Sequence, residues 1–441
     1  MTELDINTLN SNGDDASGVV STEERTENVT GYVFSNALAE QTFDPVREES
    51  MFAVRFGDSE DTRTLHHLAI KERNLLAYPL ESDLLRKGRL LLPRGPVAYG
   101  STGELVRSIE AHIGRYVVLP DGFGGLVAHY VLFTWLADRS PTTPYLHFIG
   151  DYGSGKSRAL QVVGDLCYKP LRVGGTASMA SVFRILESVG VCTLLMDETD
   201  FFRRSEAHQE MMTLLRQGFQ RGPGILRCER KDETFEPRDY DVFGPKLIAG
   251  RRNFPDPALE SRCIRIYMPS AAALGSVPIE LPDDYAEAAS LLRDKLLQWR
   301  FDHFFVPLKQ APPLSVEPRL RQVFQPLAQV ISDPASLKRL VAIVEDMQTE
   351  ATADRHSSRE ADVLNALIVD AKRLGTDQLR LKRIAEVLDL HPRRVATICR
   401  TLGLETGKDR DGTYVHFDPG ARADLLTRYG VPLPESQTEA A

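Results

Sequence analysis

Apolar positions along the chain change their spacing several times, and each change predicts a different kind of element. Short apolar runs separated by charged, Gly and Pro positions come first and indicate strands of a small β-containing module over 49–100. The runs lie at 51–56, 75–80 and 90–92. Apolar residues then recur on one helical face, at Leu105, Ile109, Ile113 and Tyr116. We expect a helix over 103–116 and a second, very apolar helix ending at 136, within a helical segment over 101–143.

From residue 145 onward, strand patterns and helix patterns alternate. Strands are expected at 145–149, 171–173, 193–196, 246–249 and 263–268. Helices are expected at 156–167, 179–189 and 206–219. This alternation predicts an α/β domain over 144–270 with a parallel sheet covered on both faces. Further helices at 283–300 and 317–347 and a polar linker at 350–359 suggest a helical lid and linker over 271–355.

Composition places the chain among globular proteins, with a charged tail at its start. It has 441 residues, 42% hydrophobic and 26% charged, and a net charge of −9. Residues 1–50 hold 11 acidic and two basic side chains, so the remainder is neutral overall. Residues 1–48 are predicted to stay disordered because they cannot bury enough apolar surface, and 431–441 form a second tail. The acidic pI therefore does not exclude a nucleic-acid partner.

Cysteines and apolar stretches argue for a reducing, membrane-free setting. The five cysteines are scattered without CxxC spacing, so neither a disulfide framework nor a zinc site is expected. The apolar stretch 126–136 is interrupted by His129 and is too short to span a bilayer. The first residues are acidic and do not resemble a signal peptide. We therefore expect a cytoplasmic protein with no membrane partner.

Residues 150–157 read Gly-Asp-Tyr-Gly-Ser-Gly-Lys-Ser and match GxxxxGK[ST] between an apolar strand and a helix. Glycines let the backbone turn its N–H groups onto phosphate oxygens, and the helix N-terminus adds a favourable partial charge. Lys156 should reach the β- and γ-phosphates in binding and catalysis, and Ser157 should ligate Mg²⁺. The motif predicts a site for ATP and Mg²⁺. Other residues expected to contact nucleotide are Gly150, Asp151, Tyr152, Gly153, Ser154, Gly155 and Arg158.

A second half of this site is expected at the end of the apolar strand 191–196, taken as a neighbour of the P-loop strand. Asp197 would complete the metal shell, and Glu198 would act as general base on the attacking water. The alternative is a pair of solvated carboxylates that cap the following helix.

Gly244–Gly250 followed by Pro257–Arg262 is similar to the continuation of an AAA+ domain, and Ala-Leu-Glu-Ser-Arg resembles a segment of MCM-type helicases. Over 103–327 the chain more closely resembles the ATPase domain of phage, plasmid and other mobile-element replication proteins, which are often fused to primases. The residues that carry this resemblance are Tyr145–Ser157, Leu194–Glu198, Phe243–Gly250 and Arg319–Leu327. It implies an AAA+ core with a helical lid, and a homo-oligomeric ring, expected to be a hexamer, that hydrolyses ATP and acts on DNA.

The resemblance also implies roles for single residues. Arg262 matches the arginine finger that faces an adjacent subunit and stabilises transition-state charge there, and Arg319 is the candidate for the lid arginine, sensor 2. The alternatives are a surface arginine for Arg262 and a solvated helix-start arginine for Arg319. One departure from the family pattern is Gly250, which stands where a polar sensor 1 residue is usual and leaves Asn253 or Arg251 to serve.

Between 222 and 240 a strand-like run, a turn and a polar return segment resemble the hairpin that points into the pore of helicase-clade AAA+ rings. Arg230 and Lys231 near its tip would contact phosphates of single-stranded DNA. A solvated hairpin without a partner is the alternative.

Residues 356–430 show the pattern of a winged-helix domain. Helices are expected at 360–374 and 381–388, and a third opens at Pro392 before a hairpin over 404–417. The span 392–410 carries five basic and two acidic side chains, which suits duplex DNA. The candidate DNA contacts are Arg393, Arg394, Arg400, Lys408 and Arg410. A winged helix used for protein contacts is the alternative.

Together these features favour a ring-forming ATP-hydrolysing DNA motor, a helicase or translocase of mobile-element or phage-type replication. Two other readings stay open. One is an ATP-switched DNA-binding initiator, loader or regulator that does not unwind DNA. The other is a defence-associated AAA+ protein whose client is a protein.

Overall fold

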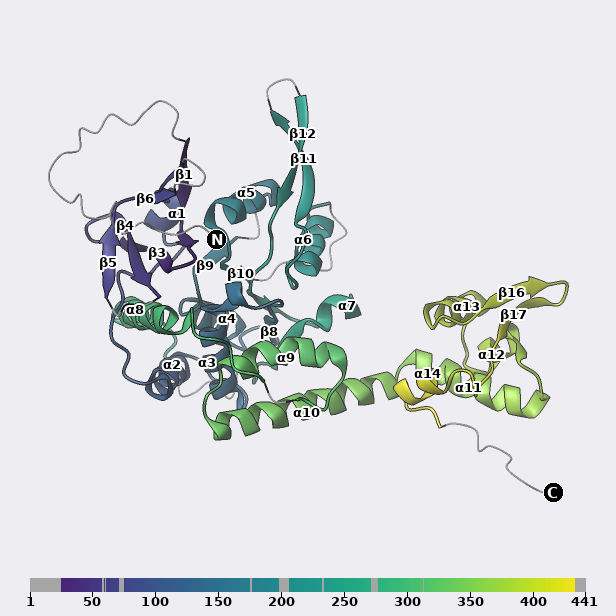
Figure 1. The fold of residues 1–441 in the computed structure, drawn as a ribbon. Coiled ribbons are helices and arrows are strands. Elements are labelled where there is room, and N and C mark those ends of the chain that lie inside the picture. The colour runs from purple at the N-terminus through teal and green to yellow at the C-terminus, as the bar shows by residue number, and fades with distance from the viewer. Residues whose placement is uncertain are drawn as a thin grey trace. The chain divides into compact units, whose positions relative to one another are not determined.

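The structure is a computed structural model that describes residues 25–57, 59, 61–70, 75–174, 177–197, 206–231, 234–270, 277–311 and 313–432. The chain divides into two compact units, residues 1–341 and 342–441. Each unit is described by itself (Figure 1). In the described residues no helix is both long and apolar enough to cross a membrane.

A five-stranded parallel sheet forms the centre of the first unit. Its strands follow the order β14-β8-β13-β10-β9. Their bounds are β8 (Tyr145–Ile149), β9 (Pro170–Val173), β10 (Thr193–Asp197), β13 (Lys246–Gly250) and β14 (Cys263–Tyr267). The runs are buried almost throughout, as in a sheet covered on both faces. The predicted α/β alternation and parallel sheet are confirmed, but β13 lies between β8 and β10, so the acid strand is not the direct neighbour of the P-loop strand.

Helices surround this sheet, and most agree with the expected positions to within a few residues. The helical stretch expected at 317–347 is instead interrupted at 331–333 and continues to residue 356. The helices within the sheet domain are α4 (Lys156–Gly164), α5 (Met179–Val189), α6 (Glu206–Gln217) and α7 (Pro257–Glu260). Before the sheet come α2 (Thr102–Tyr116), α3 (Phe123–Thr134) and the short 3-10 helix η3 (Ala137–Arg139), and after it α8 (Tyr285–His303) and α9 (Pro318–Val330). Ser101 and Glu104 form a reciprocal cap that starts α2. The expected helical face of α2 is buried, which confirms its amphipathic pattern.

The N-terminal module is larger than predicted. It contains β1 (Arg25–Val29), β2 (Gly31–Val33), β3 (Ala37–Asp44), β4 (Glu49–Phe56), β5 (Thr62–Leu65), β6 (Leu68–Ile70), β7 (Leu75–Pro79) and α1 (Asp83–Arg86). The expectation of disorder is wrong from residue 25 onward, and residues 1–24 lie outside the described residues. The physical reason is long-range pairing, because β3 pairs with β4 over its whole length and buries Phe34 and Ala39 against Phe52 and Val54.

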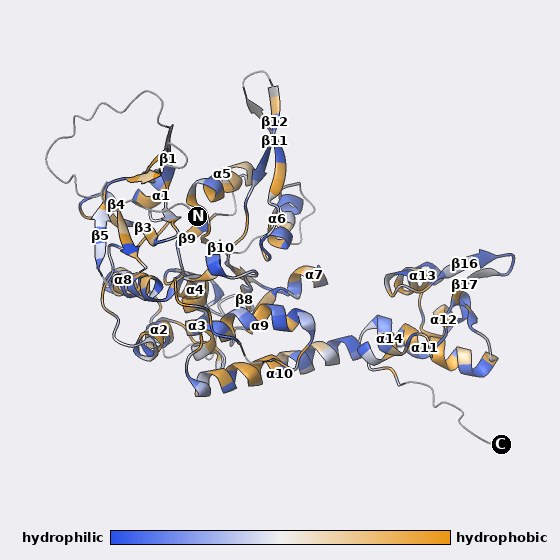
Figure 2. Ribbon diagram, in the orientation of Figure 1, coloured by the Kyte–Doolittle hydropathy of each residue, from blue (hydrophilic) through white to orange (hydrophobic). Residues whose placement is uncertain are grey.

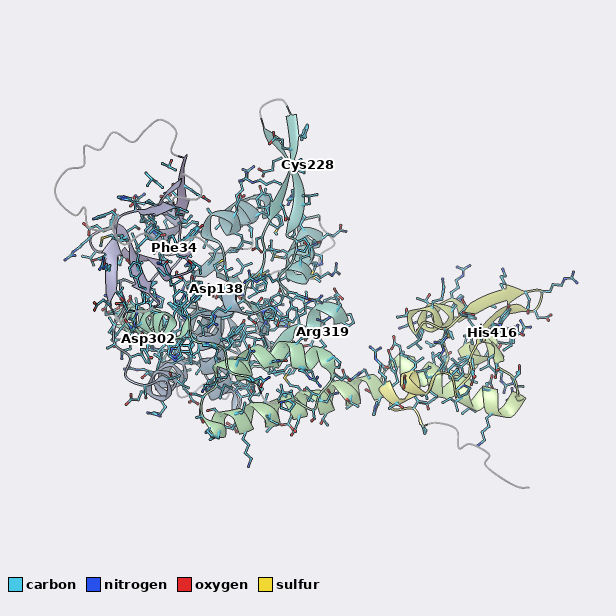
Figure 3. All side chains as sticks on the ribbon, viewed as in Figure 1. Phe34, Asp138, Cys228, Asp302, Arg319 and His416 are labelled. Carbon is cyan, nitrogen blue, oxygen red and sulfur yellow. The ribbon has the colours of Figure 1, made fainter. Side chains whose placement is uncertain are left out.

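Buried charges connect this module to the core of the same unit. Glu40 on β3 accepts from Lys169 at 3.0 Å and from Arg300 on α8 at 2.8 Å, and the Tyr168 hydroxyl donates to it at 2.8 Å. Arg300 also pairs with Asp138 at 2.6 Å (Asp138 is labelled in Figure 3). Burial would raise the pKa of Asp138, but the Arg300 guanidinium outweighs it and lowers that pKa. Each charge therefore depends on its partners, since an unpaired buried charge is costly.

A long hairpin projects from the sheet domain between α5 and α6 (Figure 1). Its strands are β11 (Ile225–Lys231) and β12 (Thr234–Tyr240), paired antiparallel from Ile225–Tyr240 out to Lys231–Thr234. Ion pairs at its base join Arg227 to Glu210 at 2.5 Å and Arg238 to Glu187 at 2.8 Å. The predicted hairpin is confirmed, and its tip lies beyond Lys231, slightly further along the chain than expected.

The second unit contains the helices and the hairpin expected near the C-terminus, together with two short elements that were not expected. They are α11 (Arg359–Leu374), β15 (Gln378–Arg380), α12 (Leu381–Val387), α13 (Pro392–Thr401), β16 (Thr406–Asp409), β17 (Gly412–His416) and α14 (Ala423–Arg428). The sheet has the antiparallel order β15-β17-β16. Its core joins α11, α12 and α13 through Leu364, Ile384 and Val395. Sequence reasoning missed β15 and α14, which are short.

The expectation of a polar linker at 350–359 is wrong. α10 (Pro334–His356) continues through most of it, and Ser358 caps the start of α11 by accepting from the Ala361 N–H at 3.2 Å. Polar composition was a poor guide here because residues 349–356 contain neither Gly nor Pro and include helix-forming alanines.

The buried charge network yields the first testable prediction. Glu40→Gln removes the carboxylate charge shared by Lys169 and Arg300 and leaves two buried cations short of a counter-charge. We expect the free energy of unfolding of the first unit to fall by about 3 kcal/mol or more. Urea unfolding followed by circular dichroism measures this, with Glu81→Gln, an exposed residue 4.0 Å from Arg86, as control. Equal stability of the two variants would contradict a structural role for the network.

Candidate nucleotide site

The loop between β8 and α4 is curved by glycines at defined positions. Gly153 and Gly155 have φ values of 74° and 82°, in the left-handed region that L side chains rarely adopt. A Cβ on Gly150 would lie 2.4 Å from Ser154 Oγ, so this position has no room for a side chain. The glycines of the motif therefore answer backbone and steric requirements of the loop, and the helix that follows directs its first N–H groups toward it.

Lys156 begins α4 and is buried, at 4% exposure. Its Nζ lies 3.4 Å from the Asp151 carbonyl oxygen, within the loop that it would cross to reach a phosphate. Ser154 Oγ is buried, and no hydrogen-bond partner for it is found in the described part of the chain. An ammonium group, an unsatisfied hydroxyl and a helix N-terminus thus converge on one loop, which is the chemistry that an anionic ligand requires.

Ser157 and Asp197 meet across the carboxyl edge of the sheet. Ser157 Oγ donates to Asp197 Oδ1 at 3.1 Å, although one strand separates β8 from β10. A hydroxyl and a carboxylate are the hard oxygen donors that Mg²⁺ prefers, so the residues present fit the expected metal. Glu198, the expected general base, lies outside the described residues.

A pocket of about 700 Å³ opens beside these two side chains, lined by α4, the ends of β9 and β10, and residues 87–89. Arg158 on its wall donates to the backbone carbonyls of Pro278 at 3.2 Å and Ile279 at 2.6 Å. In this structure the Arg158 guanidinium therefore contacts the backbone of residues 278–279 and is not directed at the P-loop, where a nucleotide contact was expected.

The end of β13, where a sensor residue was expected, is filled from the neighbouring strand. A Cβ on Gly250 would lie 2.9 Å from Nε2 of His147, a fully buried side chain on β8. Burial lowers the pKa of His147 to about 3, so its imidazole is neutral near pH 7. Of the two alternatives, Arg251 places its guanidinium 3.5 Å from the ring centre of Tyr152 in the P-loop. Asn253 instead hydrogen-bonds the Tyr267 hydroxyl at 3.2 Å.

Arg262 and Arg319 lie together at the opposite edge of the sheet. Both guanidinium carbons are 5.7 Å from the ring centre of Phe219 (Arg319 is labelled in Figure 3). The Arg262 carbonyl accepts from the N–H of Tyr145, the first residue of β8. Since the P-loop follows the last residue of β8, a five-residue strand, roughly 13 Å long, separates the two places. The structure thus places Arg319 away from the P-loop of its own chain, and its expected contact with nucleotide stays a prediction.

A buried lysine supports the segment that carries Phe219. Lys246 Nζ donates to the carbonyls of Gly244 at 2.8 Å, Val242 at 2.9 Å and Gly218 at 3.4 Å. Burial lowers the pKa of Lys246 to about 7. Sequence reasoning missed Phe219 and Lys246, because nothing local distinguishes them from ordinary core residues.

The expected DNA contacts lie on exposed elements. Arg230 and Lys231 end β11, and the positions of their side chains lie outside what the structure describes. Sequence reasoning missed two exposed apolar side chains on this hairpin, Leu226 and Phe235, at 70% and 72% exposure. Figure 2 shows hydrophobic as well as hydrophilic segments there. In the second unit the five candidate side chains are all exposed, on α13 and on the β16–β17 hairpin: Arg393, Arg394, Arg400, Lys408 and Arg410.

Comparisons with known proteins give structural matches alone. No family model matches the chain, and no curated protein matches it. Among solved structures, the apo C-terminal region of NrS-1 matches at 11% identity and a TM-score of 0.33, over 86% of this chain and 96% of that one. A full-length MCM homologue from Methanopyrus kandleri matches at 12% identity and a TM-score of 0.36, over 68% of each chain. With both TM-scores below 0.5, the chemistry of the site has to be judged from this chain's own residues.

The cradle geometry leads to the second prediction. Lys156→Ala removes the ammonium group that faces the loop, and we expect binding of a fluorescent ATP analogue to weaken by about 100-fold or more. Lys309→Ala, an exposed lysine outside the cradle, is the matched control. Equal affinity of the two variants, measured by fluorescence anisotropy, would show that the loop does not hold phosphate.

Proposed function

We propose that the chain is a P-loop ATPase whose active sites are completed between copies, and that it works as a DNA motor, a helicase or translocase of phage-type or mobile-element replication. The observation that carries the proposal is the separation of two half-sites. One edge of the sheet holds the phosphate cradle with Ser157 and Asp197, and the other holds Arg262 and Arg319.

Within one copy, the cradle would bind and orient the triphosphate. Backbone N–H groups of the loop and Lys156 would hold the β- and γ-phosphates, and Ser157 and Asp197 would hold Mg²⁺, which supplies charge neutralisation of the phosphates. Glu198 would accept a proton from the attacking water as its oxygen bonds to the γ-phosphorus. The bond from that phosphorus to the β–γ bridging oxygen breaks, leaving ADP and inorganic phosphate. Arg251, which contacts Tyr152 of the loop, takes the sensor role that Gly250 cannot fill.

A second copy would supply the missing cations. Negative charge spreads over the γ-phosphoryl oxygens in the transition state, and a guanidinium there is worth about 10³-fold or more in rate. Arg262 and Arg319 both pack against the ring of Phe219. The pKa of Arg319 is lowered, chiefly by burial and to a smaller degree by the nearby positive charge of Arg262. A contact of one edge with the opposite edge of the next copy is heterologous, and such contacts generate rings or filaments. We propose a ring, of six copies in the expected form.

DNA would meet the ring at two kinds of element. Single-stranded DNA would pass the β11–β12 hairpin, with Arg230 and Lys231 on phosphates and Phe235 available for stacking on bases. Duplex DNA would meet the second unit, whose order of helix, strand, two helices and hairpin supports a winged helix with α13 as the recognition helix.

An alternative is supported by the same unit. A basic recognition helix serves equally well in an ATP-switched DNA-binding protein, such as an initiator, loader or regulator, that assembles on duplex DNA without unwinding it.

The third prediction tests completion of sites between copies. Arg262→Ala and Lys156→Ala should each lose nearly all ATP turnover, the first while keeping ATP affinity. In an equal mixture, roughly a quarter of the junctions pair an intact cradle with an intact arginine, so turnover should partly return. Phosphate release measured in a mixing series checks this. A mixture no more active than either variant alone would exclude catalysis across the junction.

The fourth prediction separates the motor from its alternatives. We expect single-stranded DNA to raise ATP turnover, and Lys231→Ala to lose unwinding of a forked duplex while its ATP affinity matches that of Lys309→Ala. Turnover assays and a fluorescent unwinding assay give the readouts. ATP-dependent duplex binding without any unwinding by the unmodified protein would favour the switch, and turnover indifferent to every form of DNA would favour a protein client.

A further inference from the structure

The pocket beside Ser157 and Asp197 has a basic wall that the proposed catalytic cycle does not use. Four of its lining residues are basic: Lys87, Arg89, Arg158 and Arg172. Among the described residues that line it, Asp197 is the single acid, and it accepts a hydrogen bond from Ser157. The pocket therefore carries an excess of positive charge.

Three of the four cations are engaged elsewhere. Lys87 pairs with Asp83 at 2.6 Å, Arg172 pairs with Asp165, and Arg158 donates to two backbone carbonyls. Arg89 is exposed, and within the described part of the chain its guanidinium has neither an ion pair nor a hydrogen bond. It is the cation in this wall that is available to an anion.

The backbone that carries Arg89 is fastened along β9. The Arg172 N–H donates to the Arg89 carbonyl at 2.8 Å, Arg172 Nη1 donates to the Gly88 carbonyl at 2.9 Å, and the Leu91 N–H donates to the Pro170 carbonyl at 3.2 Å. These three hydrogen bonds, at residues 88, 89 and 91, hold the loop in place. Arg89 is therefore presented by a fixed backbone, which lowers the entropic cost of binding a ligand.

The Arg89 side chain points toward the carboxyl edge of the sheet. Its Nη1 lies 3.9 Å from where a Cβ on Gly174 would stand, and Gly174 directly follows β9. Val173 is in register with Met196, so Gly174 and Asp197 follow at the same edge, about one strand spacing of 5 Å apart. The guanidinium thus lies beside Gly174 in the pocket, on the edge of the sheet that also carries the P-loop and the expected magnesium site of the same chain.

We propose that Arg89 binds a terminal phosphate group in this pocket, either the γ-phosphate of bound ATP or the phosphate ion that remains after cleavage. The proposal rests on the proposed ATPase function, because that function delivers a phosphate to this edge. A guanidinium matches phosphate by forked, charge-assisted hydrogen bonds. Arg262 and Arg319 would serve the site of another copy, whereas Arg89 serves the site of its own.

The experiment compares Arg89→Ala with Arg86→Ala in the full chain. Arg86 is an equally charged, exposed neighbour that does not line the pocket, and Arg89→Lys tests whether charge alone suffices. In the first arm, affinities for a non-hydrolysable ATP analogue and for ADP are measured with Mg²⁺. If Arg89 contacts the γ-phosphate, Arg89→Ala lowers the ratio of analogue affinity to ADP affinity about tenfold, and Arg86→Ala leaves it unchanged.

In the second arm, inorganic phosphate is titrated into the chain saturated with Mg-ADP, so that the P-loop itself is filled. If Arg89 holds the cleaved ion, unmodified protein and Arg86→Ala bind phosphate, and Arg89→Ala binds it about tenfold more weakly. The two arms thereby distinguish the two sources of the phosphate group.

The outcomes are separable from those of the proposed function. If Arg89→Ala matches Arg86→Ala in both arms while the unmodified protein binds nucleotide through Lys156, the role of Arg89 is overturned and the ATPase assignment stands. If Lys156→Ala leaves nucleotide affinity unchanged, the ATPase assignment fails first and the role of Arg89 falls with it.

Discussion

The shared direction of the five sheet strands is the constraint on which the rest of this structure depends. Parallel strands bring their carboxyl ends to one edge, so the P-loop, Asp197 and Gly250 gather there with Gly174. Their amino ends lie at the other edge, together with Arg262 and its neighbours around Phe219. A side chain cannot cross the length of a strand, so one copy cannot unite both halves. Under the proposed function the sheet would therefore link chemistry to assembly, because the cradle of one copy would need the opposite edge of another.

Close packing determines which residues can stand in the P-loop and at the end of β13. Glycine is required at two positions because neighbouring side chains, Ser154 and His147, already occupy the space that a Cβ would take. At the end of β13 this leaves no room for a side chain at Gly250, and the guanidinium of the next residue, Arg251, lies against Tyr152 in the P-loop. Close packing also acts at Lys246. Its buried amino group donates to three backbone carbonyls and so holds the segment that carries Phe219.

Buried charges give the N-terminal module a place in the same unit. Glu40 connects β3 to Lys169, the residue just before β9, and to Arg300 on α8. The chain that leaves the module then runs along β9 at residues 88–91, where it carries Arg89 to the pocket. The module thus reaches the edge of the candidate nucleotide site through backbone hydrogen bonds and paired charges. Ion pairs of this kind are sensitive to loss of one partner and favour a defined geometry.

Much of this could be predicted from the sequence, and the misses have a common cause. The P-loop, the start of α2 and the strands of the central sheet depend on residues a few positions apart, so local rules were sufficient for them. The tail was predicted to be disordered up to residue 48 because its composition is acidic and polar. Its strands are instead stabilised by pairing, β1 with β7, β2 with β3 and β3 with β4, and by the buried Glu40. The linker predicted at 350–359 was wrong for the same reason. Its polar composition suggested a linker, but most of these residues continue the helix α10, which begins at Pro334.

The sequence by itself determined the P-loop motif, the kinds and order of the elements in the central sheet domain, and the basic character of α13 and the following hairpin. Tertiary structure alone decided that β13 lies between the two functional strands, that Arg319 stands beside Arg262 and away from its own cradle, and that Arg89 faces the pocket. The first group rests on steric and hydrogen-bonding rules that act over one turn or one strand. The second rests on which distant segments pack together, and the free energy of that packing is shared among contacts that no short stretch of sequence contains.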